Sequence, residues 1–260
     1  MNRQTVSNDI TYLNEPAPVS MADAWFDYGT NDHFWVKHRN AVFDRHFQSI
    51  VKRAEKIGEI GCGCGFVLSH LQQQYRRPVD GFELNLHALE LCPKLEGNLY
   101  VYDIFQRHPD LVAQYDLLLM MDVLEHIEDE AAFLAATYDH LKPGGYLIIA
   151  VPTRQHLYSA YDVAAGHHRR YSDRRLRAVT AAAGLTVHKT VHWGHCYLPI
   201  LMLRQLLIKD VSEDEAIKQG FAVSSIMNWC MSQLRWLDLL PTFGITGTAG
   251  LIVAQKPSST

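Results

Sequence analysis

Several features are scarce in this sequence, and each scarcity excludes a class of protein. Only 16 Gly and 10 Pro occur in 260 residues, too few for a collagenous or disordered chain. The cysteines are odd in number and form no CxxC pair, a pattern typical of a reducing compartment and not of a disulfide framework. They are Cys62, Cys64, Cys92, Cys196 and Cys230. Because Cys62 and Cys64 flank a single glycine, they are too cramped for zinc ligands, and no metal site is expected.

Long apolar stretches and a basic excess are also missing. The longest apolar run, 196–208, is interrupted by Arg204 and Gln205, whereas a membrane-spanning helix needs about 20 residues. The polar stretch 1–18 lacks the apolar core of a signal peptide, so a cytoplasmic location is expected. Lys and Arg total 24 against 28 Asp and Glu, a net charge of −4. This balance disfavours a protein whose main task is binding nucleic-acid phosphates.

What is present, from residue 56 onward, is an alternation of short apolar strands with helical stretches. The pattern predicts strands at 56–60, 79–83, 99–102, 115–121, 146–151, 186–193 and 249–255, and helices at 66–75, 86–92, 129–141 and 172–183. Helices of this length between strands imply parallel crossovers. We therefore predict an α/β fold with a doubly wound, mostly parallel sheet, in which a ligand binds beyond the carboxyl ends of the strands.

Four regions follow from this pattern. Residues 1–50 form an N-terminal arm, flexible or loosely docked to about residue 22, and a helical cap. Residues 51–196 form the ligand-binding domain, 197–244 a helical insertion, and 245–260 carry the last strand. Ser212 and Glu215 fit a capping box that opens a short insertion helix ending at Gly220. An apolar stripe at helical spacing follows. It suits a lid, a homodimer face or weak contact with a membrane surface. Its residues are Val223, Ile226, Met227, Cys230, Met231, Leu234 and Leu237.

The segment 59–65, Glu-Ile-Gly-Cys-Gly-Cys-Gly, lies where the first of these strands turns into its helix. Alternate glycines allow a tight turn and close approach of a ligand, and the helix start behind them offers free N–H groups. Phe66 occupies the place of the third glycine of a dinucleotide fingerprint. The Glu59 carboxylate suits a ligand with a cationic amine and repels a pyrophosphate. A nicotinamide-dependent reductase is thus disfavoured but stays open.

This glycine segment resembles the first motif of class I S-adenosylmethionine (SAM)-dependent methyltransferases. Further matches follow in the family's order: an acidic residue ending the second strand, an Asp after the third, the segment Asp-Val-Leu-Glu-His at 122–126, and Lys-Pro-Gly-Gly at 142–145. The resemblance covers residues 34–190 and the last strand. It implies a Rossmann-like, seven-stranded sheet with SAM as cofactor, its methionine part at 59–65, its ribose at Glu83 and its adenine at Asp103.

The resemblance also implies particular contacts. The predicted cofactor-binding residues are Glu59, Gly61, Cys62, Gly63, Gly65, Glu83, Leu84, Asp103, Ile104, Met121, Asp122, Trp35 and Arg39. His126 is the candidate catalytic base, although its segment can equally serve to shape a turn. Methyl transfer from a sulfonium is an in-line displacement that needs little acid or base help.

Two mixed clusters bear on the acceptor. In segment 33–39, the aromatic residues either cover the cofactor or pack on the core. In segment 166–172, Gly-His-His-Arg-Arg-Tyr-Ser either anchors a loop or holds the phosphate or carboxylate of an anionic acceptor. The candidate substrate-binding residues are His33, His167, Arg170 and Tyr171.

The predicted function is transfer of a methyl group from SAM to an oxygen or nitrogen atom of a small-molecule or glycolipid-like acceptor. A SAM-binding partner subunit without catalytic activity is an alternative that intact cofactor motifs do not exclude. A nucleic-acid methyltransferase is disfavoured by the net charge and by the lack of an Asn-Pro-Pro-Tyr or Pro-Cys segment.

Overall fold

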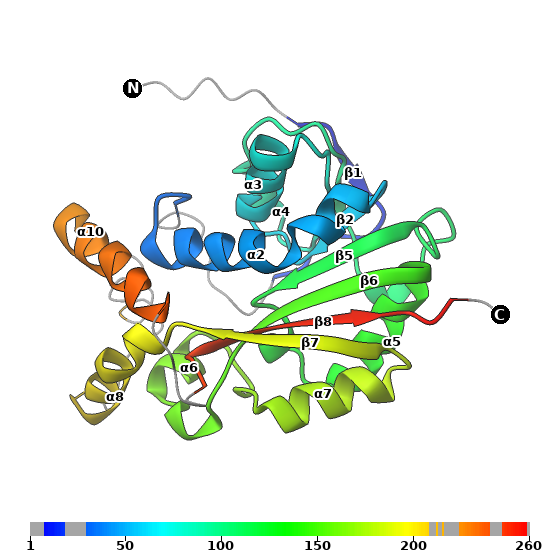
Figure 1. Ribbon diagram of the computed structural model, residues 1–260. Helices are drawn as coiled ribbons and strands as arrows, with labels where there is room; N and C mark the ends of the chain where they lie inside the picture. Colours follow the sequence, from blue (N-terminus) through cyan, green and yellow to red (C-terminus); the bar gives the residue numbers. More distant parts are fainter. Residues whose placement is uncertain are drawn as a thin grey trace.

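An eight-stranded sheet forms the centre of the molecule (Figure 1). The computed structural model describes residues 8–18, 30–207, 212, 215, 224–239 and 246–258. The strand order is β1-β4-β3-β2-β5-β6-β8-β7. The strands are β1 (Ile10–Tyr12), β2 (Ile57–Ile60), β3 (Asp80–Glu83), β4 (Leu99–Val101), β5 (Tyr115–Met121), β6 (Leu141–Pro152), β7 (Thr186–Trp193) and β8 (Ala249–Gln255).

The sheet is doubly wound, as predicted. Strands β1 to β6 pair in parallel, and β8 lies between β6 and β7, antiparallel to both. The chain runs outward from β2 to β3 and β4, then returns to the other side of β2 to form β5. The point between β2 and β5 is therefore the topological switch point, where ligands of such sheets bind.

The sheet has one strand more than the seven expected, because part of the predicted flexible arm pairs with it. Residues 10–12 form β1 beside β4. The Asn8 side chain donates to the Pro93 carbonyl at 2.9 Å, and Asn14 Oδ1 accepts from the Asp103 N–H at 2.8 Å. These contacts dock residues 8–14 along β4, from the segment that precedes it to Asp103 at its carboxyl end. Residues 1–7 and 19–22 of the predicted arm lie outside the described residues.

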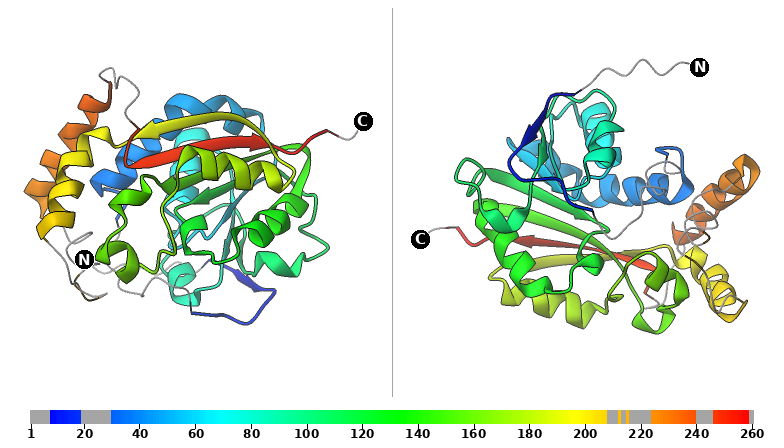
Figure 2. Two further views of the ribbon diagram at one scale, coloured as in Figure 1. Left: turned by 90° about the horizontal axis from the view of Figure 1, so that it is seen from below. Right: turned by 180° about the vertical axis from the view of Figure 1, so that it is seen from behind.

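Helices cover both faces of the sheet (Figures 1 and 2). One face carries α2 (Phe34–Arg53), α3 (Phe66–Tyr75) and α4 (Leu86–Glu90), and the other carries α5 (Glu130–His140) and α7 (Asp173–Ala182). The Ser172 side chain accepts from the Arg175 N–H and caps α7, as predicted. Helix α5 ends at His140, and residues 142–145 already belong to β6.

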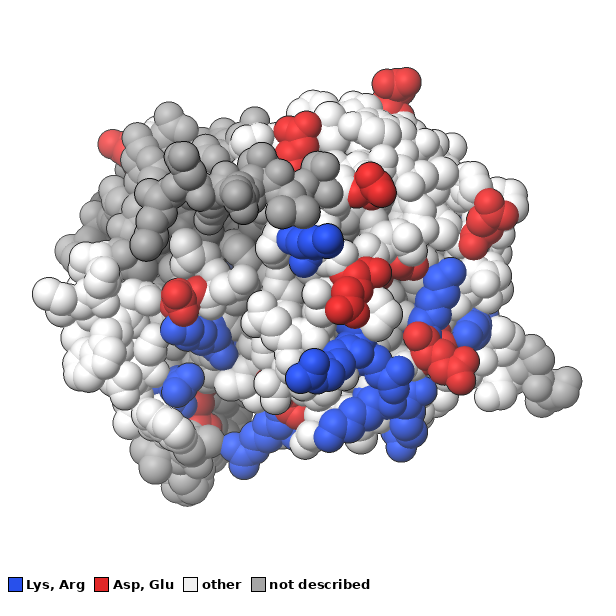
Figure 3. All heavy atoms as spheres, turned by 90° about the horizontal axis from the view of Figure 1, so that it is seen from above, with Lys and Arg blue, Asp and Glu red and all other residues white. Residues whose placement is uncertain are grey.

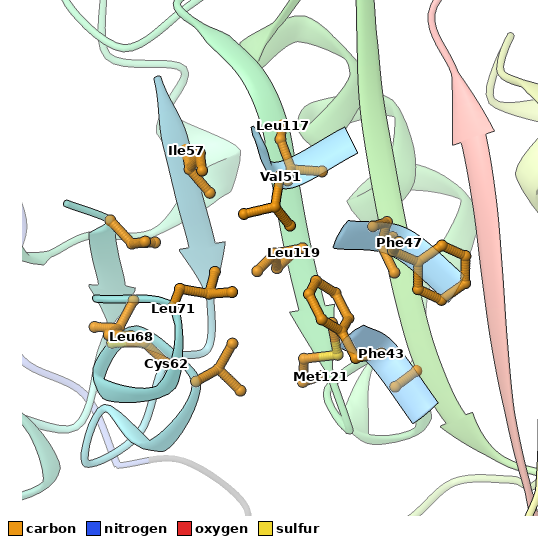
Figure 4. Packing of buried hydrophobic residues seen from close by; sticks show 14 of the residues in the cluster. Phe43, Phe47, Val51, Ile57, Cys62, Leu68, Leu71, Leu117, Leu119 and Met121 are labelled. Atoms are coloured by element: carbon orange, nitrogen blue, oxygen red, sulfur yellow. The ribbon is translucent and has the colours of Figure 1, made fainter. Parts of the chain in front are cut away.

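The long helix α2 contributes much of the core. Phe43, Phe47 and Val51 lie on its buried side, and Figure 4 shows Val51 beside Leu117 and Phe43 beside Met121 of β5. Burying each such side chain stabilises the fold by about 1.5–3 kcal/mol. This packing fixes the position of α2, whose first turns carry several of the predicted site residues.

The insertion follows β7 and lies at one end of the sheet. Because β7 is antiparallel to β8, and β8 to β6, the carboxyl end of β7 lies at the same edge as that of β6. There the chain forms η4 (His195–Tyr197) and α8 (Leu198–Leu207), and later α10 (Ser225–Leu234) and η5 (Arg235–Leu239). Helices α8 and α10 both lie beyond this edge (Figures 1 and 2).

Part of the predicted insertion pattern falls on described residues. The Ser212 hydroxyl accepts from the Glu215 N–H at 3.4 Å and Glu215 Oε2 accepts from the Ser212 N–H at 3.3 Å, as a capping box requires. Gly220 and Val223 lie outside the described residues. The apolar stripe is largely exposed at Ile226, Met227 and Leu237. None of the helices in the described ranges is long and apolar enough to cross a membrane.

Candidate cofactor and acceptor site

A glycine loop links β2 to α3 at the switch point. Gly61 adopts φ 67°, and a Cβ built on it would lie 2.6 Å from Val123 Cγ2. Gly63 and Gly65 also have positive φ, and Gly65 caps the start of α3. Only glycine takes up such a backbone at low cost, so the loop curls tightly before the free N–H groups of the helix. The predicted turn is confirmed.

Glu59 lies at the end of β2, beneath this loop, and is buried. Its Oε2 atom has no hydrogen-bond partner among the described residues. Burial raises the pKa of this carboxyl to about 8, while the nearby Arg39 opposes the rise. A buried carboxyl with one oxygen left unsatisfied is the counterpart that a cationic ligand group would need.

The raised pKa of Glu59 leads to a prediction about stability. In the folded chain Glu59 keeps its proton to about pH 8, whereas the unfolded chain releases it near pH 4.5. The contribution of Glu59 to the free energy of unfolding is therefore fully present below about pH 4.5. It is lost as the pH rises towards 8, by on the order of a few kcal/mol. Glu59→Gln should remove this loss, so the variant gains stability relative to the wild type at pH 8.

Urea unfolding between pH 5 and pH 8, without cofactor, measures this difference. The exposed Glu96, changed to glutamine, is the matched control and should keep the wild-type dependence. Parallel pH profiles for the wild type and Glu59→Gln would contradict the raised pKa.

Glu83 ends β3 next to the glycine loop and is held by three backbone N–H groups. Its Oε2 accepts from Gly63 at 3.0 Å, and its Oε1 accepts from Leu84 at 2.8 Å and Asn85 at 3.0 Å. Burial raises the pKa of Glu83, and these donors counteract the rise. The side chain therefore connects the loop to the end of β3, where the sequence predicts the ribose.

Asp103 follows β4 at the same edge of the sheet. Its Oδ1 accepts from the Phe105 N–H at 3.0 Å, which caps the short helix that begins at Ile104. Ile104 is buried. The docked N-terminal segment crosses this place, because Ala17 N–H donates to the Leu84 carbonyl at 3.0 Å. The predicted adenine side is thus built from β3, β4 and the N-terminal segment.

Asp122 directly follows β5 and has an unusual backbone. Its φ is 58°, a left-handed conformation that costs energy for a residue with a side chain. Arg39 Nη1 donates to Asp122 Oδ2 at 2.8 Å across the switch point. Arg39 Nε has no hydrogen-bond partner in the part of the chain that the structure describes. Strained backbone of this kind is frequent at functional sites.

The remaining predicted residues near the cofactor have different surroundings. Cys62 is buried under the loop, and Met121 is buried at the end of β5. Trp35 packs on Trp193 of β7, with 4.3 Å between ring centroids, and so lies against the insertion side of the sheet. His33 is buried and caps α2 by accepting from the Trp35 N–H. The structure thus gives His33 and Trp35 packing contacts.

On the acceptor side, the Asp-Val-Leu-Glu-His segment meets the loop after β6. The rings of His126 and His167 lie perpendicular, 4.7 Å apart. Ligand atoms of Glu125, His126 and His167 lie within 4.8 Å of one another, a spacing that also suits a divalent ion. Burial, with His167 beside it, lowers the pKa of His126 to about 3, so the imidazole is neutral and only weakly basic.

Arg170 and Tyr171 are buried anchors of this loop. Arg170 Nε donates to Asp162 Oδ1 at 2.7 Å, and the same oxygen contacts His167 Nδ1 at 3.0 Å. The Tyr171 hydroxyl donates to Glu130 Oε2 at 2.6 Å, and no part of its side chain is exposed. Of the two interpretations of segment 166–172, these contacts favour the anchor, whereas His167 still lies beside Glu125 and His126.

Sequence reasoning missed Glu125 and Asp162. Glu125 is buried, its Oε2 has no partner among the described residues, and burial together with Asp122 raises its pKa. It stands within the recognised motif, and a carboxyl directly before His126 was the available signal. Asp162 lies in the short helix α6 (Ala160–Ala164), where nothing in the local pattern marks it.

The residues present fit SAM. This cofactor carries an ammonium, a sulfonium, a carboxylate and ribose hydroxyls. Glu59 offers an unsatisfied buried oxygen, Arg39 an unsatisfied Nε, and Glu83 a fixed carboxylate, around a loop without Cβ atoms at its tightest turns. These groups lie at the carboxyl ends of β2, β3 and β5, where the fold places a ligand.

Comparison with known proteins agrees with this site. A family model described as a methyltransferase domain matches residues 35–190. A ubiquinone biosynthesis O-methyltransferase from Hydrogenovibrio crunogenus is 29% identical over 157 residues, 55% of this chain and 61% of that protein. One from Marinobacter nauticus is 29% identical over 164 residues, 59% of this chain and 66% of that protein. A SAM-dependent methyltransferase from Archaeoglobus fulgidus has the same fold, with TM-score 0.57, 18% identity, and coverage of 90% of this chain and 97% of that one.

The fold and the site define a class I SAM-dependent methyltransferase. The chain belongs to the methyltransferase-domain family whose model spans residues 35–190. The alignments with the two O-methyltransferases span less than two thirds of the length of those proteins.

Proposed function

We propose that this protein transfers the methyl group of SAM to an oxygen atom of a small phenol-type acceptor. The observation that carries the proposal is the set of three acidic side chains, Glu59, Glu83 and Asp122, which end adjacent strands around one glycine loop. The names of the O-methyltransferases similar to this chain favour oxygen as the acceptor atom.

In this proposal the cofactor is held by the groups described above. Glu59 would face the ammonium, Arg39 the carboxylate, Glu83 the ribose, and Asp103 with Ile104 the adenine. Bound there, SAM supplies an electrophilic methyl group for an in-line displacement. The chain's own contribution is to orient the two reactants and to exclude water, which can supply much of the rate.

The acceptor would lie between β5 and the loop 153–171, beside Glu125, His126 and His167. His126, neutral because of its low pKa, can accept the proton that the acceptor hydroxyl loses. The ligand atoms of Glu125 and His167 lie within 4.8 Å of those of His126, so the acceptor would meet all three side chains. Arg170 and His167 would favour an acceptor that carries an anionic group.

The insertion supports an acceptor with an apolar part. Its helices lie beyond the carboxyl edge of the sheet and expose Trp229, Trp236 and Met202, together with Ile226 and Met227. Exposed apolar side chains in such number mark an interaction surface. We infer that this surface receives the apolar part of the acceptor, as a lid, within a homodimer face or at a membrane surface.

Calorimetric titration with SAM, S-adenosylhomocysteine and NADH is the first test. Micromolar binding of the first two without NADH binding is expected. S-adenosylhomocysteine production is then followed with small phenols and with phenols that carry a polyprenyl chain. Turnover with a phenol supports the proposal, and turnover confined to amines contradicts the oxygen assignment. Tight SAM binding without turnover of any acceptor in the panel would favour the alternative of a partner subunit without catalytic activity. Binding of NADH alone would favour the nicotinamide-dependent reductase.

A nucleic-acid acceptor is disfavoured by the charge distribution. Lys and Arg side chains gather in the lower half of the face in Figure 3, but Asp and Glu side chains lie among them. A nucleic-acid-binding surface requires clustered basic residues that displace counterions. Methyl transfer to RNA or DNA fragments at physiological salt would overturn this view.

A further inference from the structure

A cluster of metal-binding side chain types lies outside the site described so far. His38 comes from α2, His195 and Cys196 follow β7 in η4, and Asp238 lies in η5 of the insertion. Ligand atoms of His38, Cys196 and Asp238 lie within 4.8 Å of one another. We propose that His38, Cys196 and Asp238 bind a zinc ion that joins the cap helix, the end of β7 and the insertion, with His195 beside Asp238 as the neighbour that can complete the set.

The ligand atoms of His38, Cys196 and Asp238 lie close enough together to share one ion. Zinc bonds of about 2.0–2.3 Å place neighbouring ligand atoms roughly 3.3–3.8 Å apart. His38 Nε2 lies 3.3 Å from Asp238 Oδ2, and His195 Nδ1 lies 3.8 Å from Asp238 Oδ1. One thiolate and one carboxylate beside two neutral imidazoles give a charge of −2, which a divalent ion neutralises in a buried place.

His195 has both ring nitrogens available to a cation. Neither ring nitrogen of His195 has a hydrogen-bond partner in the described ranges, and both nitrogens are buried. His38 Nδ1 contacts the Tyr197 hydroxyl at 3.1 Å, and that hydroxyl donates to the Met231 carbonyl at 3.4 Å. One hydroxyl proton cannot serve both contacts; when it goes to the Met231 carbonyl, His38 Nδ1–H donates to the Tyr197 oxygen. The Nε2 lone pair of His38 then faces a carboxylate oxygen, and a cation between them satisfies both.

The surroundings hold the ligands in place. Asp238 accepts from the backbone N–H groups of Cys196, at 2.9 Å, and of Gly194. Tyr197 orients His38, as outer partners of metal-binding histidines do. The Trp193 ring packs against His38, 5.0 Å between centroids, and shields the cluster from water. The four residues are spread over 200 positions of the sequence, so no spacing motif marks them. For this reason the sequence alone predicted no metal site.

Metal binding by the full chain tests the proposal without any turnover, so its outcome is independent of the proposed methyl transfer. After chelator treatment and dialysis, the protein is titrated with Co²⁺ and then with Zn²⁺. A bound cobalt ion with a cysteine ligand should show thiolate-to-cobalt charge transfer and the visible bands of four-coordinate cobalt, and zinc should abolish them. The group of Glu125, His126 and His167 holds no thiol and cannot produce the charge-transfer band.

Variants decide the assignment. Cys196→Ala should lose the charge-transfer band, and Asp238→Asn should lower zinc affinity by about ten- to a hundredfold or more. Cys230→Ala, which removes the exposed cysteine of α10, is the matched control and should behave as wild type. Cys196→His should keep zinc binding but not the band. Zinc should raise the Tm of the wild type and leave that of Cys196→Ala unchanged.

Three outcomes would overturn the proposal. These are a wild type without the band, a band that survives in Cys196→Ala, and a band that disappears in Cys230→Ala. Because SAM titration shows independently whether Cys196→Ala is folded, loss of the band in a variant that still binds SAM cannot come from unfolding.

Discussion

Replacing Glu83 by alanine should weaken SAM binding by at least about a hundredfold. The side chain accepts N–H bonds from Gly63, Leu84 and Asn85, so it fixes both the glycine loop and the predicted ribose position. Each hydrogen bond between a charged carboxylate and a ribose hydroxyl contributes about 1.5–3 kcal/mol. Losing the bonds to both ribose hydroxyls therefore corresponds to roughly a 10²–10⁴-fold loss of SAM affinity. The sheet should survive, because the apolar core does not depend on this carboxylate.

Calorimetric titration with SAM measures the affinity, and a thermal melt checks the fold. Glu90→Ala, which removes an exposed carboxylate at the end of α4, should leave the affinity unchanged. If Glu83→Ala bound SAM as tightly as the wild type, the ribose assignment and the cofactor site built on it would be wrong.

Replacing His126 by alanine should lower kcat about a hundredfold while the SAM affinity stays within a factor of two or so. The estimate lies at the lower end of general-base contributions, because a pKa of about 3 makes this imidazole a weak base. The same pKa keeps His126 neutral above pH 5, so its own titration should not reduce the wild-type rate between pH 5 and pH 8.

Single-turnover rates and SAM titrations separate these two effects. The matched control is His168→Ala, since His168 is exposed in the same loop. If the kcat of His126→Ala stayed within threefold of the wild type, His126 would not be the base. The segment 122–126 would then serve to shape the turn after β5, which is the alternative that the sequence left open.

The parts of the fold that the sequence predicted well are those with strong local signals. Strands β5, β7 and β8 begin and end where the sequence pattern predicts; β5 and β8 are buried on both faces, whereas β7 is a partly exposed edge strand. The glycine loop followed from Gly61 and its neighbours, since a positive φ leaves few other residues possible. Glu59 and Glu83 followed from their places at strand ends.

The parts that were missed depend on contacts between distant residues. β1 has three residues and no periodicity, and it is held by Asn14 against Asp103, a pair that no local rule connects. The burial of Tyr171 depends on Glu130, and the cluster around His38 depends on Asp238 in the insertion. Such partners become visible only when the sheet brings their elements together.

The position of β8 between β6 and β7 has a consequence for synthesis of the protein. β7 cannot join the sheet when it leaves the ribosome, because its only neighbour in the described sheet, β8, is made after the whole insertion. Until then the edge of β6 is open, and an open edge with apolar faces is prone to aggregation. A nascent chain stalled within the insertion should therefore need chaperone protection, which a chain extended past β8 would no longer require.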